Sequence, residues 1–198
     1  GTGRGAGSHE VATFGIMDTS ETKAMWDEAA PEILRMFEQK DYSFEGQYFK
    51  VPTPHNILPK PYGTGHPPMW VACGNPATFA KAGNLGIGAI AFNFEPIMNL
   101  KGRIDSYKEA AAECTEPIGQ FQNDNVMMTN AVVCLEDRDR AREIAISSGR
   151  GYLNTMVTMY HDTMPKMEGA VTWPGRPNGI ADESTLDWAI DAGYLKEQ

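Results

Sequence analysis

The chain has 198 residues, of which 41% are apolar and 22% are charged, and its formal net charge at pH 7 is −9. This length and composition suit one globular domain, placed over residues 1–198, and exclude a disordered chain. The acidic charge disfavours nucleic acid and anionic lipid as partners, and no apolar run is long enough to span a membrane. Three widely spaced cysteines favour free thiols in a reducing, cytoplasmic setting.

The first third of the chain predicts a helix, a hairpin and a loop. Apolar residues recur at helical spacing over 26–37, and Pro31 within that run predicts a kink or a restart. The aromatic segments 42–44 and 47–49 flank a Glu-Gly pair, which predicts a short hairpin. Six prolines over 52–68 predict an ordered but irregular loop, because neither a helix nor a central strand tolerates that density.

Three strand–helix units follow this loop. Because the predicted strands are continuous apolar runs without alternation, we expect both faces of the sheet to be buried, as in a parallel sheet covered by helices. Strands that alternate with helices at this spacing indicate an α/β fold. The predicted strands are 69–72, 87–92 and 126–135, and the predicted helices are 76–83, 97–111 and a charged helix that begins near 136. The signal weakens after 149, where a last helix is predicted over 185–192.

The segment Cys73-Gly74-Asn75-Pro76-Ala77-Thr78 joins the first of these strands to its helix. Asn75 is a preferred N-cap residue, proline suits the first helical position, and Thr78 falls at the third. This arrangement directs unpaired backbone N–H groups and the positive end of the helix dipole outward, which favours a phosphate. Asn75 and Thr78 can add side-chain donors. The alternative is an ordinary turn whose cap satisfies only its own helix, and such turns are commoner than ligand sites.

Arg4 lies between Gly3 and Gly5 in a glycine-rich opening segment. A guanidinium in such a turn can meet an anion through two hydrogen bonds. The alternative is a solvated arginine without a ligand. The segment does not complete a dinucleotide fingerprint, because Ala6 stands where a third glycine would be needed and no strand precedes it.

Other candidates for chemistry are weaker. His9, next to Glu10, is a candidate for acid–base catalysis, although such a pair more often opens a helix or a solvated loop. Tyr160 and Trp173 are candidates for apolar contact with a substrate, although aromatic residues commonly belong to the core. The remaining histidines have no second His or Cys at metal-ligand spacing, so no metal site is predicted.

An ordered set of loose motifs over about residues 1–145 resembles the luciferase-like flavin-dependent monooxygenases. The motifs are Gly3-Arg4-Gly5, Phe14-Gly15, Phe44-Glu45-Gly46-Gln47-Tyr48-Phe49, Leu58-Pro59-Lys60-Pro61, His66-Pro67-Pro68-Met69-Trp70-Val71-Ala72 and Ala82-Gly83-Asn84-Leu85-Gly86. The resemblance implies a (β/α)8 barrel. About four strand–helix units are predicted, one whose strand ends at Arg4 and the three described above. Because a barrel needs eight, we expect a partial barrel within a longer protein. It would comprise roughly strands 4 to 7 with an inserted hairpin and Pro-rich loop, and would lack the first strands and the last.

The resemblance also implies a cofactor site. Arg4 looks like the family's arginine at the flavin phosphate, and Cys73, Gly74, Asn75 and Thr78 look like the turn that closes on the same phosphate. Bacterial luciferase has an acid and a serine at the positions of Gly74 and Asn75, so side-chain contacts there differ while backbone donation is retained. The family's catalytic histidine and most groups around the flavin ring belong to opening strands that have no counterpart here.

The implied function is an oxidoreductase that uses reduced FMN and O2 on a small organic substrate. The deazaflavin F420, which carries hydride, is an alternative cofactor, because both cofactors place a phosphate at the matching position. A non-catalytic flavin-binding paralogue is a further alternative. A flavin reductase as partner and a homodimer are also expected from the family, and the fragment is expected to be inactive alone.

Overall fold

The computed structural model describes residues 1–5, 11, 13–16, 20–92, 97–129 and 132–148. It divides into two compact units, one made of Gly1–Arg4 with Thr22–Thr129 and the other of Gly5–Glu21 with Asn130–Gln198. The first unit carries the sheet and most predicted site residues. No helix in the described ranges is long and apolar enough to cross a membrane.

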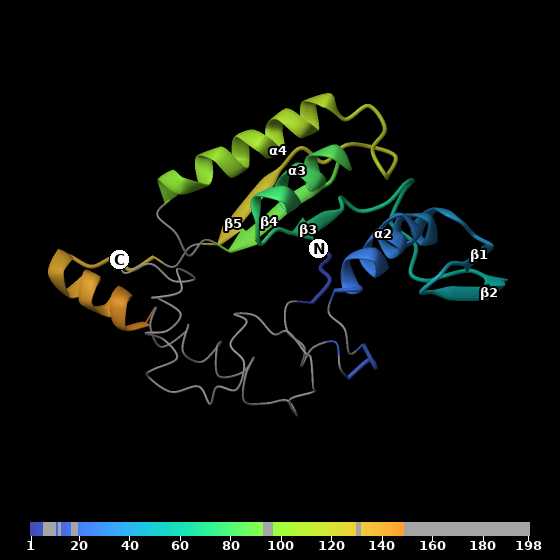
Figure 1. The fold of residues 1–198 in the computed structure, drawn as a ribbon, viewed down its shortest axis with the longest axis horizontal. Coiled ribbons are helices and arrows are strands. Elements are labelled where there is room, and N and C mark those ends of the chain that lie inside the picture. Colours follow the sequence, from blue (N-terminus) through green and yellow to red (C-terminus); the bar gives the residue numbers. More distant parts are fainter. Residues whose placement is uncertain (6–10, 12, 17–19, 93–96, 130–131, 149–198) are drawn as a thin grey trace. The chain divides into compact units, whose positions relative to one another are not determined.

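The central feature of the first unit is a three-stranded parallel sheet, in the order β3 (Trp70–Ala72), β4 (Gly88–Phe92) and β5 (Val126–Thr129) (Figure 1). The chain's first residues lie beside β3, where Thr2 forms a parallel bridge with Val71. All four segments run in one direction, so their carboxyl ends meet at one edge of the sheet. This edge is where ligands bind in parallel α/β folds.

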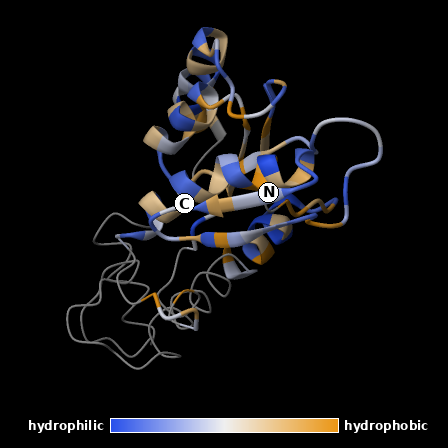
Figure 2. Ribbon diagram, turned by 90° about the vertical axis from the view of Figure 1, so that its right-hand side faces the viewer, coloured by the Kyte–Doolittle hydropathy of each residue, from blue (hydrophilic) through white to orange (hydrophobic). Residues whose placement is uncertain are grey.

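Helices cover one face of this sheet. They are α2 (Thr22–Glu38), α3 (Pro76–Asn84) and α4 (Lys101–Glu113), the last preceded by the short helix η1 (Ile97–Leu100). The helices show both blue and orange segments, as expected when one side is buried and the other is solvated (Figure 2). The buried cluster joins residues of all three helices to the sheet, with members that include Ala30, Leu34, Val71, Phe79, Ala82, Ala89, Ala91, Tyr107 and Ala111.

The predicted α/β organisation and the helices over 76–83 and 97–111 are confirmed, whereas two expectations about the sheet are wrong. The last strand ends at Thr129, and residues 132–135 are not a strand. The sheet is also not buried on both faces, since Phe92 is 61% and Met127 is 49% exposed. The alternate residues Val126 and Met128 pack against the buried cluster. The cause is that the described helices cover a single face.

Helix α3 is bounded by strong local signals. Its first residue is proline, and it ends in a Schellman motif. In that motif the Gly86 amide donates to Gly83 O at 2.9 Å and the Ile87 amide donates to Ala82 O at 3.1 Å. Gly86 has φ +67°, and a Cβ there would lie 2.5 Å from Pro117 Cβ, so glycine is required.

The predicted hairpin is present, but its second strand differs from the prediction. Strand β1 (Tyr42–Glu45) pairs with β2 (Lys50–His55) in an antiparallel ribbon, so the predicted strand at 47–49 is instead the turn. Pro52 and Pro54, expected in an irregular loop, lie in β2. A two-stranded ribbon has an unpaired edge, and an edge strand accepts prolines because their missing N–H groups are not needed there.

Glu28 of α2 holds the hairpin turn. Its carboxylate accepts hydrogen bonds from the amides of Gln47, Tyr48 and Phe49 at 2.6, 3.0 and 2.9 Å. A Cβ on Gly46 would lie 2.5 Å from the Glu28 carboxyl carbon, so a glycine leaves room for this contact. The Phe44–Phe49 motif therefore has a structural role, which is to dock the hairpin on α2.

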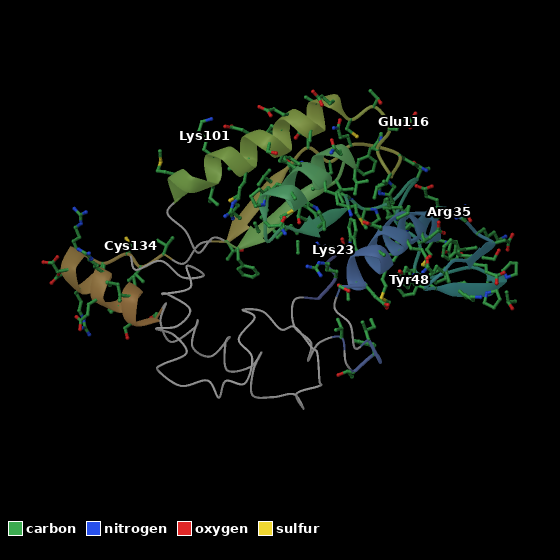
Figure 3. The ribbon with its side chains drawn as sticks, in the orientation of Figure 1. Lys23, Arg35, Tyr48, Lys101, Glu116 and Cys134 are labelled. Carbon is green, nitrogen blue, oxygen red and sulfur yellow. The ribbon has the colours of Figure 1, made fainter. Side chains whose placement is uncertain are left out.

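The C-terminal end of α2 is capped by the Pro-rich segment. The Lys60 ammonium donates to Met36 O at 2.7 Å and to Gln39 O at 2.6 Å, which satisfies carbonyls that the helix end leaves free. Helix α2 runs without interruption through Pro31, so the predicted restart does not occur. Figure 3 shows Lys23 at the start of this helix and Arg35 near its C-terminal end.

In the second unit, the described residues include a helix over 138–148. Its start is capped by Asp137, whose Oδ1 accepts from the amides of Asp139 and Arg140 at 2.9 and 3.0 Å. The predicted charged helix near residue 136 is confirmed.

Candidate anion-binding site

The turn after β3 begins with a residue that faces the core. Cys73 is 4% exposed, its amide donates to Ile90 O at 2.7 Å, and its thiol contacts Val71 O at 3.5 Å. Burial raises the pKa of the Cys73 thiol to about 11, against a smaller lowering by the backbone at Ile90. Cys73 is therefore a neutral core residue whose contribution is to fix where the turn starts.

Asn75 caps α3 as the sequence predicts. Its Oδ1 accepts from the Thr78 amide at 3.1 Å and from the Thr78 hydroxyl at 3.2 Å. The hydroxyl proton of Thr78 is thus committed to the cap. The Asn75 side-chain NH2 group remains as a donor, because the capping contacts use only the amide oxygen.

Gly74 lies over open space. It is exposed, and a Cβ built on it meets nothing within 4 Å. Among the described residues, no group accepts a hydrogen bond from the amides of Gly74, Asn75 or Ala77. The N-terminal end of α3, residues 74–77, therefore presents free N–H donors next to a volume that a ligand can enter, and is called the mouth of α3 below.

Arg4 reaches the same edge of the sheet from the neighbouring segment. The Ala72 amide donates to Thr2 O at 2.8 Å, and a Cβ on Gly3 would lie 3.6 Å from Ala72 Cβ. Arg4 directly follows Gly3, just as Cys73 directly follows the last residue of β3. The two segments therefore end at the same edge of the sheet, and Arg4, which follows one of them, is exposed.

The Arg4 side chain has one polar contact within the described residues, a hydrogen bond of 3.0 Å from Nη1 to Thr22 Oγ1. Thr22 is the first residue of α2 and is 4% exposed. Sequence reasoning missed this residue. The signal that could have found it is a threonine at a helix start, where its hydroxyl commonly serves a local polar group.

Three predicted site residues, His9, Tyr160 and Trp173, lie outside the described residues, as does the predicted helix at 185–192. Within the described ranges, no group of three or more His, Cys, Asp or Glu side chains could hold a metal ion. The buried His66 is structural, since its Nε2 accepts from the Gln120 amide at 2.9 Å, its Nδ1 bonds Pro67 O at 2.9 Å, and its ring stacks on Phe121.

Parallel strands covered by helices on one face place this chain among the α/β proteins. Residues 1–181 match the family model of the luciferase-like monooxygenases, and the chain belongs to that family. The family resemblance seen in the sequence is thereby confirmed. Comparison with curated protein sequences gave no match.

Two solved structures show the same fold. Monooxygenase RslO1 from Streptomyces bottropensis matches with a TM-score of 0.55 and 23% identity over 78% of this chain and 50% of that chain. The oxygenating constituent of 3,6-diketocamphane monooxygenase from the CAM plasmid of Pseudomonas putida, a type II Baeyer-Villiger monooxygenase in complex with FMN, matches with a TM-score of 0.60 and 14% identity over 97% and 50%. The chain thus spans about half the length of each matched structure.

Proposed function

We propose that this chain is the phosphate-binding part of a flavin-dependent monooxygenase that uses reduced FMN and O2 on a small organic substrate. The observation that carries the proposal is the pairing of an exposed arginine with an open helix mouth at one sheet edge, in a chain of the luciferase-like monooxygenase family. When bound, the flavin supplies the redox chemistry. The residues described here bind and orient its phosphate.

The donors at this edge fit a phosphate group. Arg4 supplies a positive charge with several N–H donors, and the amides of Gly74, Asn75 and Ala77 supply neutral donors aligned with the helix dipole. The space over Gly74 leaves room for the phosphate oxygens. Cys73 anchors the start of the turn in the core, and Thr78 holds the Asn75 side chain in place.

The uncovered sheet face supports the proposed partial barrel. In a (β/α)8 barrel the inner face of each strand packs against other strands of the same barrel. Ala72, Phe92 and Met127 are exposed on the face opposite the helices, and the match with each solved structure covers only 50% of that structure's chain. We assign the four segments to roughly strands 4 to 7, with the β1–β2 hairpin as an insertion.

The cofactor alternative remains F420, because its phosphate fits the same donors and the family likeness does not separate the two. A cytoplasmic location, a flavin reductase that supplies reduced flavin and a homodimer complete the proposal. The reductase and the homodimer are proposed from the family resemblance, and the location is proposed from the three free thiols.

Titration of the 198-residue chain with FMN, F420 and riboflavin tests the proposal. Riboflavin lacks the phosphate and is the matched control ligand. We expect FMN or F420 to bind more tightly than riboflavin, and Arg4→Ala to remove that difference. An unchanged affinity for both phosphate-bearing cofactors in Arg4→Ala would contradict the proposed site.

A further inference from the structure

Arg4 differs from Arg35 and Arg140 in the chemistry of its partner. The Arg35 guanidinium is paired with the Glu32 carboxylate at 2.8 Å, and the Arg140 guanidinium with Glu143 at 2.7 Å. Arg4 instead donates to a neutral hydroxyl, that of Thr22, at 3.0 Å. A hydroxyl restrains the guanidinium without neutralising it, so the full positive charge of Arg4 stays available to an anion.

Thr22 is well suited to hold another side chain in place. It is 4% exposed and is the first residue of α2, so its backbone is fixed by the helix. As a β-branched residue it has few χ1 rotamers. A free arginine side chain loses much rotamer freedom when it binds a ligand, and a contact already made in the ligand-free protein reduces that loss.

The helix that carries Thr22 is tied to both halves of the site. One turn later on α2, Trp26 Nε1 donates to Thr2 Oγ1 at 3.3 Å, which holds α2 against the segment that leads to Arg4. The Lys81 ammonium of α3 lies 5.2 Å from the Trp26 ring centroid and also pairs with Asp27. Helix α2 therefore braces the Arg4 segment against α3, whose first turn forms the other half of the site.

We infer that Thr22 is a positioning residue, whose hydroxyl aims the Arg4 guanidinium at the phosphate that the mouth of α3 binds. This inference rests on the proposed function. It assigns to Thr22 no contact with the ligand. The hydroxyl oxygen accepts one of the five guanidinium N–H donors, and the others remain for the phosphate.

The test compares Thr22→Val, which keeps the shape and removes the hydroxyl, with Thr22→Ser, which keeps the hydroxyl. We expect Thr22→Val to weaken FMN binding by about three- to tenfold, the range for the net contribution of one typical hydrogen bond. Thr22→Ser should bind as the unchanged chain does. Riboflavin binding and the melting temperature should be the same in all three, which a general structural defect would not allow.

Two further variants distinguish loss of the Thr22–Arg4 hydrogen bond from a general loss of positive charge near the site. Lys23→Gln removes a positive charge from the same helical turn but keeps the hydroxyl, and we expect a smaller loss than in Thr22→Val. In an Arg4→Ala background, Thr22→Val should cause no additional loss. As a readout without ligand, ¹⁵N relaxation of the Arg4 Nε–H group should show faster motion in Thr22→Val.

The outcomes distinguish this inference from the proposed function. If Arg4→Ala weakens FMN binding and Thr22→Val does not, the positioning role is overturned and the proposed site stands. If Thr22→Val weakens riboflavin and FMN equally, the residue is only structural and the inference also fails. If Arg4→Ala leaves FMN binding unchanged, the proposed function fails and this inference fails with it.

Discussion

The Asn75 side-chain oxygen accepts both the amide and the hydroxyl proton of Thr78, at 3.1 and 3.2 Å. One residue pair therefore starts α3 and at the same time determines which groups remain for a ligand. The oxygen of Asn75 is used by the cap, and its NH2 group is not. In the proposed site, stability and ligand binding would therefore depend on different atoms of the same side chain.

Asn75→Asp should separate these two roles. Aspartate is as good an N-cap as asparagine and its charge suits the helix dipole, so we expect the melting temperature to be kept or raised. The same carboxylate would repel a phosphate, and FMN affinity should fall at least tenfold. Asn75→Ala is the reciprocal control and should cost about 1 kcal/mol of stability. Calorimetry and FMN titration of both variants provide the measurement. Equal FMN affinity in Asn75→Asp would remove Asn75 from the site.

The close approach of α3 and α4 predicts a strong effect at Gly83. A Cβ on Gly83 would lie 2.5 Å from Tyr107 O and 2.8 Å from Ala110 Cβ, so Gly83→Ala forces the helices apart. We expect a loss of about 1–3 kcal/mol in the free energy of unfolding, measured by denaturant titration. Gly102→Ala in α4, which meets nothing within 4 Å, is the control and should be neutral or stabilising by up to about 1 kcal/mol. Similar behaviour of the two variants would contradict this packing.

The hairpin should loosen in acid because of Glu28. Desolvation raises the pKa of this carboxyl, but the hydrogen bonds from the amides of Phe49, Tyr48 and Gln47 together lower it below its ordinary value. Its stabilising contribution is therefore complete above the unfolded pKa, about 4.3, and is lost as the pH falls toward the lower folded pKa. Amide exchange protection at these three residues should decrease over that pH range.

Glu28→Gln is the control for this acid effect. The hairpin also carries the exposed Glu45–Lys50 pair, which titrates in the same range. If Glu28 is responsible, the variant should show low protection at neutral pH and little further loss in acid. A pH dependence that persists unchanged in Glu28→Gln would assign the effect to the other carboxylates.

Cys73 and Cys134 should differ in reactivity. Cys73 is buried and its thiol pKa is raised to about 11, so little thiolate exists at pH 8. Cys134 is exposed. Mass spectrometry after brief iodoacetamide treatment of the native chain should find Cys134 alkylated and Cys73 unmodified. Rapid labelling of Cys73 would show that the turn after β3 opens or that its thiol faces solvent.

Local signals predicted much of this fold. The continuous apolar runs predicted β3 and β4, and the Asn-Pro start predicted α3, since helix caps and short-range periodicity depend on residues close together in the sequence. The second hairpin strand was missed because Pro52 and Pro54 indicate a loop unless the strand is known to lie at an edge.

Long-range contacts could not be predicted in the same way. Glu28 meets a turn about twenty residues away, and Lys60 caps a helix end from a separate segment. The same holds for Thr22, whose partner Arg4 lies 18 residues earlier. The pattern of a helix shows which face is apolar, but it does not show which polar group stands opposite its first turn.

The most direct test of the central claim is a double-mutant cycle between Arg4→Ala and Gly74→Val, with FMN affinity as the quantity measured and riboflavin as the control ligand. If both positions act on one phosphate, each single variant weakens FMN binding and the double variant is little weaker than the worse single one. Riboflavin affinity stays unchanged throughout. Fully additive losses, or equal losses for riboflavin, would show that Arg4 and the α3 mouth do not share a ligand group.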